Sequence, residues 1–165
     1  MPKPPSQPGC AWVEECIEEC GGPTLFVDEH GVRATFRNPQ RQRLRKIHYE
    51  GCYAAAEARQ ADYILGLIDV IDVVVELKGS DTNIKSAADQ VESTIAAWKM
   101  DEKRAPRITA LIVYGRIEGP KKLPGRIPRT EAVISGVIAR FLKRGTLLVI
   151  EETGRRQYSF RDFMG

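Results

Sequence analysis

The sequence has no apolar run long enough to cross a membrane, and its first residues lack the basic-then-apolar pattern of a secretory signal. The stretch MPKPPSQPG is rich in proline and polar residues, which favours a disordered tail over residues 1–9. We therefore expect one domain over residues 10–165, a cytoplasmic location and no membrane partner.

The chain also lacks the short motifs of several enzyme classes. It contains no GxxxxGK[ST] loop, no dinucleotide-binding fingerprint and no serine–histidine–aspartate pattern. It has no zinc finger, recognition helix or aromatic RNA-binding signature, so direct reading of bases has no support. The two histidines, His30 and His48, are interpreted as ordinary surface or core residues.

Cysteine is scarce, and the four cysteines form no CxxC pair; they are Cys10, Cys16, Cys20 and Cys52. In a cytoplasmic protein this predicts free thiols, and the spacing does not support the alternative of a metal or iron–sulfur site. The stretch CAWVEECIEECGG places Trp12, Cys16 and Cys20 at helical spacing before two glycines, which predicts a short amphipathic helix.

Hydrophobic periodicity predicts an α/β fold, with a central mixed β-sheet flanked by helices. After the first helix we expect a hairpin over 23–39 that turns at Gly31, an extended segment over 41–53 and two strands over 61–79. A helix over about 84–100 and a buried strand over 107–115 follow. The chain then continues with a loop over 116–129, a second long helix from after Thr130 to Gly145, and a closing hairpin over 146–160.

The stretch DVVVELKGSD places two opposite charges in an apolar strand. Side chains two residues apart share one face of a strand, so Glu76 and Lys78 project together while Val75 and Leu77 face the other way. Charges in a buried strand need partners or an ion. The alternatives are an ion pair on an edge strand of an unrelated interaction domain, or part of a metal site.

Asp62 lies just upstream, in the first of the two strands predicted over 61–79. A hairpin between these strands brings Asp62 near Glu76, and two carboxylates together form an oxygen site that suits Mg²⁺, with Mn²⁺ as a substitute. A lysine beside such a site can orient an attacking water or stabilise charge on a phosphate. This chemistry is that of phosphodiester hydrolysis.

Asp62, Glu76 and Lys78 resemble the motif of the PD-(D/E)xK nuclease superfamily, also called restriction-endonuclease-like. The resemblance covers roughly residues 43–114, and the order of predicted elements agrees with the core of that family. It implies that Asp62 and Glu76 bind the metal and that Lys78 is catalytic. Several branches carry a glutamine on the following helix, and Gln90 occupies that place, which implies a role in positioning Lys78 or the scissile phosphate.

Two features depart from or extend the family pattern. Ala61 replaces the proline that precedes the aspartate in the motif. The family often supplies another acidic residue, and the sequence leaves the choice open among five glutamates: Glu14, Glu15, Glu18, Glu19 and Glu50. Each of the first four is also interpreted as a solvated charge on a helix face.

Basic residues occur in two runs, although the formal net charge is only +3. Arg41, Arg43 and Arg45 alternate, so an extended segment shows all three on one face, and guanidinium groups match phosphate oxygens in geometry and charge. The predicted loop adds a second set, consisting of Lys121, Lys122, Arg126 and Arg129. The two runs beside an acidic motif favour nucleic acid, with DNA as the expected partner.

The sequence therefore predicts a Mg²⁺-dependent nuclease with a restriction-endonuclease-like core, and the family resemblance implies that it can act as a homodimer. The alternative is a nucleic-acid-binding or assembly module that keeps this fold without turnover. The completeness of the motif argues for the enzyme.

Overall fold

The computed structural model describes residues 7–54, 59–80, 84–115 and 126–165. Its main sheet has seven strands in the order β1-β2-β5-β6-β7-β8-β9. Pairing is antiparallel from β1 to β7, and β8 runs parallel to both β7 and β9. The strands are β1 (Cys10–Glu14), β2 (Ile17–Cys20), β5 (Leu44–His48), β6 (Tyr63–Leu67), β7 (Ile71–Lys78), β8 (Arg107–Tyr114) and β9 (Leu148–Glu152).

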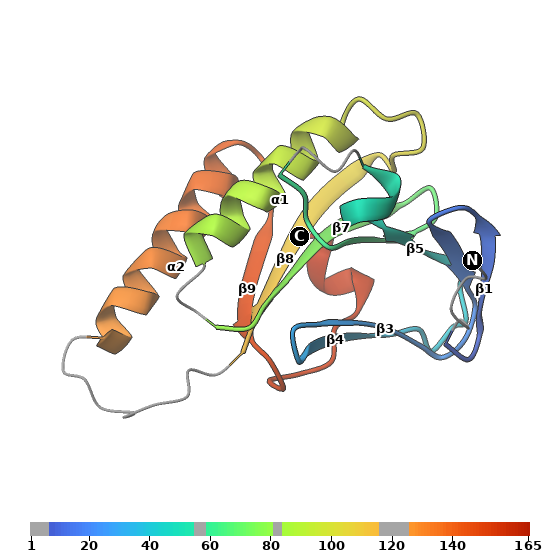
Figure 1. Cartoon of the computed structure of the whole chain (residues 1–165), viewed down its shortest axis with the longest axis horizontal. Helices are drawn as coiled ribbons and strands as arrows, with labels where there is room; N and C mark the ends of the chain where they lie inside the picture. The colour runs from blue at the N-terminus through green and yellow to red at the C-terminus, as the bar shows by residue number, and fades with distance from the viewer. Residues whose placement is uncertain (1–6, 55–58, 81–83, 116–125) are drawn as a thin grey trace.

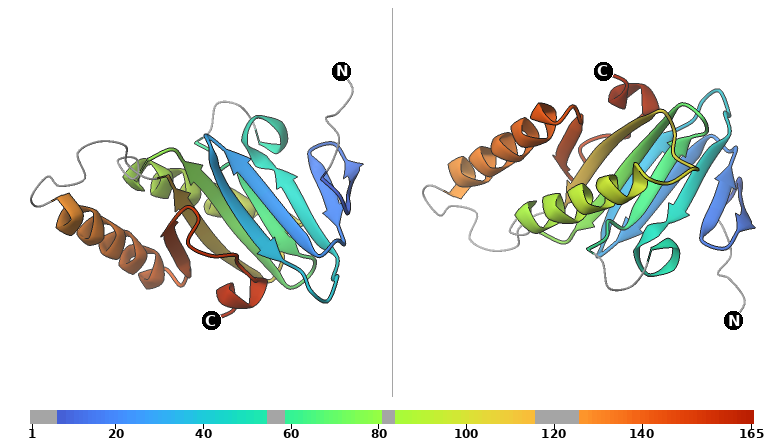
Figure 2. Two further views of the ribbon diagram at one scale, coloured as in Figure 1. Left: turned by 90° about the horizontal axis from the view of Figure 1, so that it is seen from below. Right: turned by 90° about the horizontal axis from the view of Figure 1, so that it is seen from above.

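Helices and a separate hairpin cover opposite faces of this sheet (Figure 1). The helices α1 (Ile84–Trp98) and α2 (Arg126–Lys143) lie on one face. The hairpin of β3 (Thr24–Glu29) and β4 (Val32–Arg37) lies on the other, and the carboxyl-terminal turn η3 (Phe160–Phe163) packs beside it (Figure 2). The expected α/β class with a mixed sheet flanked by helices is confirmed.

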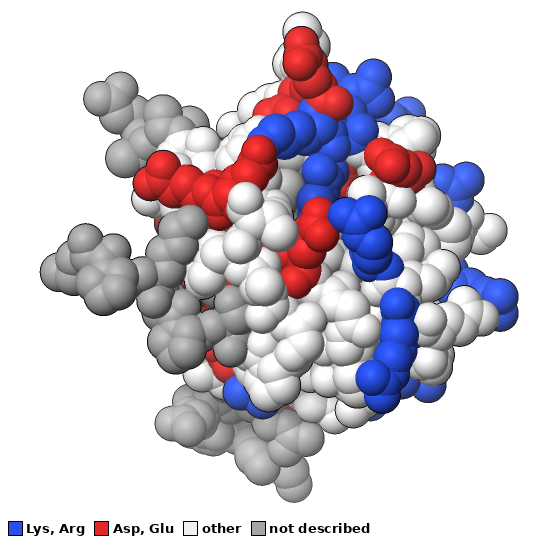
Figure 3. All heavy atoms as spheres, turned by 90° about the vertical axis from the view of Figure 1, so that its right-hand side faces the viewer, with Lys and Arg blue, Asp and Glu red and all other residues white. Residues whose placement is uncertain are grey.

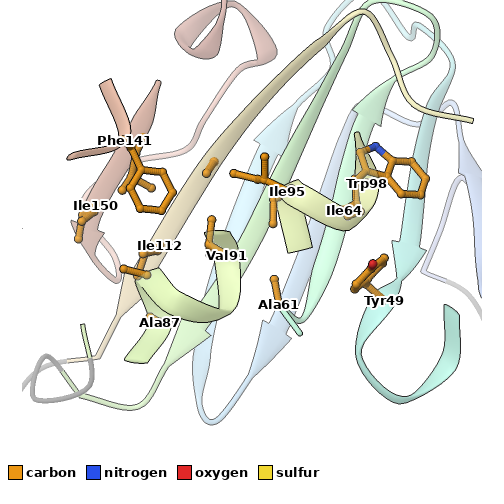
Figure 4. Packing of buried hydrophobic residues seen from close by; sticks show 14 of the residues in the cluster. Tyr49, Ala61, Ile64, Ala87, Val91, Ile95, Trp98, Ile112, Phe141 and Ile150 are labelled. Carbon is orange, nitrogen blue, oxygen red and sulfur yellow. The ribbon is translucent and has the colours of Figure 1, made fainter. Parts of the chain in front are cut away.

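Alternation along the strands divides the core into two layers. Even-numbered residues of β7, such as Val74, face the helices and pack with Val91 and Ile112, as Figure 4 shows for this layer. Odd-numbered residues, such as Val75 and Leu77, face the β3–β4 hairpin. All eight residues of β7 except Lys78 are buried, because this strand lies between two neighbours and under both layers.

Most of the expected elements are confirmed. The β3–β4 hairpin turns at His30 and Gly31, both with positive φ, which suits a two-residue turn. The two strands over 61–79, the helix beginning at Ile84 and the strand from Arg107 also appear where periodicity predicts them. The second long helix is present as α2 but begins at Arg126, inside the segment expected to be a loop.

Two expected elements are wrong, and the extended segment expected over 41–53 is present only in β5, because Tyr49–Tyr53 form the turn η1. Residues 10–22 form the β1–β2 hairpin, because β2 pairs with β5 and buries Ile17 there, and because Cys16 has φ of 70°, outside the helical region. The expected closing hairpin stops after β9: the chain then forms a single bridge between Tyr158 and Phe36 and ends in η3. In both cases contacts made far away in the sequence outweigh the local pattern.

The prediction of free thiols is also wrong, because all four cysteines are paired. Cys10 bonds to Cys20, its cross-strand neighbour in the β1–β2 hairpin. Cys16 bonds to Cys52, which joins the turn between β1 and β2 to the segment after β5. The folded chain brings each pair together, and spacing alone did not indicate this.

Two further predictions concern the amino-terminal tail and membrane-spanning helices. Gln7 holds the start of the chain on the β3 strand: its side-chain amide donates to the Thr24 carbonyl at 3.2 Å, and the Phe26 N–H donates to its Oε1 at 3.1 Å. The predicted tail over 1–9 is therefore ordered from Gln7, and residues 1–6 lie outside the described part. Within the described residues, no helix is long and apolar enough to cross a membrane.

Candidate functional site

The ends of β6 and β7 bring together the acidic residues of the motif. Asp62 immediately precedes β6, and the Tyr63–Val75 pairing places it opposite Glu76. The Asp62 N–H donates to Oε1 of Glu76 at 3.2 Å, and the Leu77 N–H donates to Oδ2 of Asp62 at 2.8 Å. Both carboxyl groups are buried, with residue exposures of 6% and 1%. The hairpin predicted between these strands therefore places the two carboxylates as the motif requires.

Lys78 completes the cluster at the end of β7. Its Nζ lies 3.4 Å from Oε2 of Glu76, and its side chain is 18% exposed. The ion pair of the alternative interpretation is present, but its expected place on an edge strand is wrong, because β7 lies between β6 and β8. The ammonium group reaches solvent while the carboxylate beside it does not.

Of the five candidate glutamates, Glu50 lies beside Asp62. It lies in η1 (Tyr49–Tyr53), a short turn after β5 whose backbone departs from helical angles at Glu50 and Gly51. Hydrogen bonding to the Asp62 carboxyl, followed by burial, raises the pKa of Glu50. The turn is placed by the Tyr49 N–H, which donates to the Asp62 carbonyl at 3.1 Å.

The other four glutamates lie elsewhere. Glu18 bonds to His48 at 2.6 Å on the face of the sheet that packs against the β3–β4 hairpin, and Glu19 bonds to Arg43. Glu14 pairs with Lys103, and Glu15 lies in the exposed β1–β2 turn. Glu18 is buried in an ion pair, so of these four only the remaining three are solvated charges.

Burial of several carboxyl groups together controls their protonation. Burial, and then the hydrogen bond and charge of Glu76, raise the pKa of Asp62 to about 7. Burial also raises the pKa of Glu76, although Asp62 and Lys78 act in the opposite direction. Carboxyl groups that crowd in this way hold protons between them, or share a cation in place of those protons.

Gln90 lies on α1 beside the same strand end. Its Nε2 donates to the carbonyl of Gln60 at 3.2 Å, while its Oε1 is buried without a partner among the described residues. The Ala61 N–H donates to the Thr94 hydroxyl at 2.8 Å, one turn further along α1. The helix thus braces the residues that lead into Asp62.

Gln60 is a contributor that sequence reasoning missed. Its carbonyl accepts from Gln90, and its Oε1 accepts from the Gly51 N–H at 3.0 Å, so it joins α1 to the turn that carries Glu50. Gln60 precedes β6 in a segment without periodicity, and no local signal indicates its role.

The candidate site offers oxygen ligands of the kind that a hard divalent cation binds. Asp62, Glu76 and Glu50 supply carboxylate oxygens, which suit Mg²⁺ or Mn²⁺. Across the described ranges, no three His, Cys, Asp or Glu side chains are already arranged as a metal-binding group. The chemistry of the donors therefore fits the ion, while burial favours the protonated forms of Asp62 and Glu76.

The predicted arginine face is only partly present. Arg45 is the one member within β5, and its guanidinium bonds to both oxygens of Asp72 at 3.2 Å and packs over Trp98 with 12% of its side chain exposed. Arg43 is 72% exposed and bonds to Glu19. Arg41 is exposed and has φ of 49°, so it belongs to a turn and not to the strand.

Charges of both signs share the side of the molecule that bears β1. Figure 3 shows acidic and basic atoms interleaved in its upper part, with basic atoms alone toward the lower right. Lys121 and Lys122 lie outside the described residues, and Arg126 and Arg129 belong to α2. The structure thus brings Asp62, Glu76 and Lys78 together and bonds Gln90 to the carbonyl of Gln60, two residues before Asp62. It does not gather the arginines around them.

Comparison of the chain with protein-family models, curated proteins and solved structures finds no match.

Proposed function

We propose that the protein is a metal-dependent nuclease that hydrolyses phosphodiester bonds, with DNA as the expected substrate. The observation that carries the proposal is the meeting of Asp62, Glu76 and Lys78 at adjacent strand ends, with the two carboxyl groups buried and hydrogen-bonded across the strands. Buried acidic oxygens beside a solvent-reaching ammonium suit an enzyme that handles a cation and a phosphate together.

The connectivity supports the same proposal. An antiparallel run of β5, β6 and β7 is followed by α1 and by β8 parallel to β7. This order agrees with the restriction-endonuclease-like core that the motif implies, in which the aspartate begins one strand and the glutamate and lysine lie on the next. Gln90 lies on the intervening helix, where branches of that family carry a glutamine.

Each residue then has a defined task. Asp62 and Glu76, with Glu50 beside them, would hold Mg²⁺ or Mn²⁺, which when bound polarises a phosphoryl oxygen and acidifies a bound water. Lys78 would orient the attacking water and stabilise charge on the phosphate. Gln90 would position Lys78 or the scissile phosphate through its unpartnered oxygen and amide. Arg41, Arg43, Lys121 and Lys122 remain proposed backbone contacts, whereas Arg45 is occupied by Asp72.

A binding module without turnover is the second candidate. The observation that favours it is that the described residues hold no ready three-ligand metal group. In that case the Glu76–Lys78 pair would be a structural feature of the central strand.

Cleavage assays separate the two candidates. Labelled single-stranded, duplex and branched DNA, and RNA, are incubated with Mg²⁺ or Mn²⁺, and wild type is compared with Lys78→Ala and Glu76→Ala. Lys99→Ala is the matched control, because Lys99 is exposed just beyond the far end of α1. We expect metal-dependent cutting that falls by about 100-fold or more in the two site variants. Binding that is intact in every variant, without cutting of any substrate, would support the module.

A further inference from the structure

The Cys16–Cys52 disulfide lies beside the β2–β5 pairing, where the His48 N–H also donates to the Cys16 carbonyl at 2.8 Å. Cys16 lies in the turn between β1 and β2, and Cys52 lies in η1, two residues after Glu50. The bond closes a separation of 36 residues. It therefore connects a peripheral hairpin to the turn that carries an acidic residue of the candidate site.

Hydrogen bonds hold η1 both at its ends and in its middle. At one end the Tyr49 N–H donates to the Asp62 carbonyl, and at the other the Tyr53 hydroxyl donates to Asp101 at 2.6 Å. Between them, the Gly51 N–H donates to Gln60 Oε1, and the Glu50 N–H reaches the Asp62 carbonyl only at 3.4 Å. The disulfide at Cys52 adds a covalent constraint to these hydrogen bonds in the middle of the turn.

The two disulfides differ in exposure. Cys52 is an exposed residue, whereas its partner Cys16 is 5% exposed. In the other bond, Cys20 is 2% exposed and Cys10 is half-buried. Cys52 is therefore the most exposed of the four cysteine residues, and it is where we expect a thiolate in solution to attack.

We propose that the Cys16–Cys52 bond is a redox-modifiable site whose state determines where the Glu50 carboxyl lies relative to Asp62. The co-reactant is a dithiol: one thiolate attacks Sγ of Cys52, the disulfide bond breaks, and Cys16 leaves as a thiolate that takes a proton from water. The second thiol of the reductant then displaces Cys52, so the protein gains two electrons and the dithiol becomes a disulfide. Only the consequence for metal binding rests on the proposed nuclease function.

The test compares two double variants. In Cys16→Ser/Cys52→Ser the proposed site is removed, and in Cys10→Ser/Cys20→Ser the matched cross-strand bond is removed. Amide hydrogen exchange is followed at Gly51 and Ala54, whose N–H groups bond to Gln60 and to the Tyr49 carbonyl. We expect exchange about ten-fold faster or more when the 16–52 bond is absent, and no change at these amides in the control. Titration of the wild type with a dithiol should give the same increase.

Mn²⁺ binding, measured by water proton relaxation, gives the second readout. We expect the dissociation constant to rise by about ten-fold or more without the 16–52 bond and to stay constant in the control. Unchanged exchange at Gly51 and Ala54 would overturn the proposal, as would faster exchange with unaltered Mn²⁺ affinity. If no form binds Mn²⁺, the nuclease proposal fails, and the exchange rates alone still decide whether the bond holds the turn.

Discussion

Asp62 and Glu76 are joined reciprocally across the β6–β7 pair: the Asp62 N–H donates to the Glu76 carboxyl, and the Asp62 carboxyl accepts from the N–H of Leu77, the residue after Glu76. The backbone of each strand therefore orients the acidic side chain of the other. A change that shifts the pairing of β6 and β7 by even one residue would remove both hydrogen bonds. The geometry of the candidate site is in this sense a property of the sheet.

The stability of the metal-free protein should fall as the pH rises from about 4 to about 7. Unfolded Asp62 loses its proton near its ordinary pKa of 3.8, whereas the folded carboxyl keeps it until the pKa of about 7. The folded state thus binds more protons between these values, and the free energy of unfolding decreases, by an amount on the order of a few kcal/mol.

Urea unfolding between pH 4 and pH 8 measures this effect. Asp62→Asn should show a flatter dependence and should be more stable than wild type above pH 7, because no carboxylate must be buried. Added Mg²⁺ should stabilise the wild type more at pH 8 than at pH 5 and should have little effect on the variant. Equal slopes in the two proteins would refute the buried, protonated Asp62.

Replacement of Gln90 should separate catalysis from folding. Its Oε1 is buried without a described partner, so Gln90→Leu removes a polar group that the fold does not use and loses one bond to the Gln60 carbonyl. If Gln90 positions Lys78 or the phosphate, cleavage should fall by about 10-fold or more, with Mn²⁺ binding retained. Ser93→Ala, elsewhere on α1, is the control. Full activity in Gln90→Leu would assign the residue to the core only.

Asp72 should be a principal determinant of stability, although it lies far along β7 from the site. Its buried carboxylate accepts from the Trp98 indole at 2.8 Å, from the Ala105 N–H at 2.7 Å and from Arg45. Asp72→Asn leaves Arg45 without its counter-charge and should lower the free energy of unfolding by about 3–5 kcal/mol.

Asp69→Asn is the matched control for this change. Asp69 is exposed in the β6–β7 turn with φ of 65°, a conformation that asparagine tolerates well. We expect a change within about 0.5 kcal/mol in chemical unfolding. Similar losses in the two variants would show that the Asp72 bonds contribute little.

Two glycines should respond to alanine in opposite directions. A Cβ at Gly66 would lie 2.5 Å from Oδ1 of Asp72, its cross-strand partner, so Gly66→Ala should cost about 1–3 kcal/mol by displacing that carboxylate. A Cβ at Gly136, inside α2, meets nothing within 4 Å, and Gly136→Ala should stabilise by up to about 1 kcal/mol. Thermal melting of both variants measures the two changes in stability. A stabilised Gly66→Ala would contradict the close packing of Gly66 against Asp72.

Long elements with strong periodicity were predictable because their pattern and their tertiary role agree. The apolar run in the strand that ends at Lys78 indicates burial on both faces, and the helical spacing from Ile84 to Trp98 indicates one buried face; both are buried in this way. The β1–β2 hairpin was not predictable, since its glutamates and cysteines have helical spacing. Pairing with β5 and the positive φ of Cys16 decide its form.

The residues of the candidate site also divide into those that the sequence predicts and those that only the fold brings together. The sequence by itself determined that Asp62, Glu76 and Lys78 lie at the ends of neighbouring strands, because a period of two fixes which side chains share a face. Only the tertiary structure decided that Glu50 joins them, that Arg45 is occupied by Asp72 and that Cys16 meets Cys52. Those contacts join residues 12 to 36 positions apart, and no local period specifies a distance of that kind.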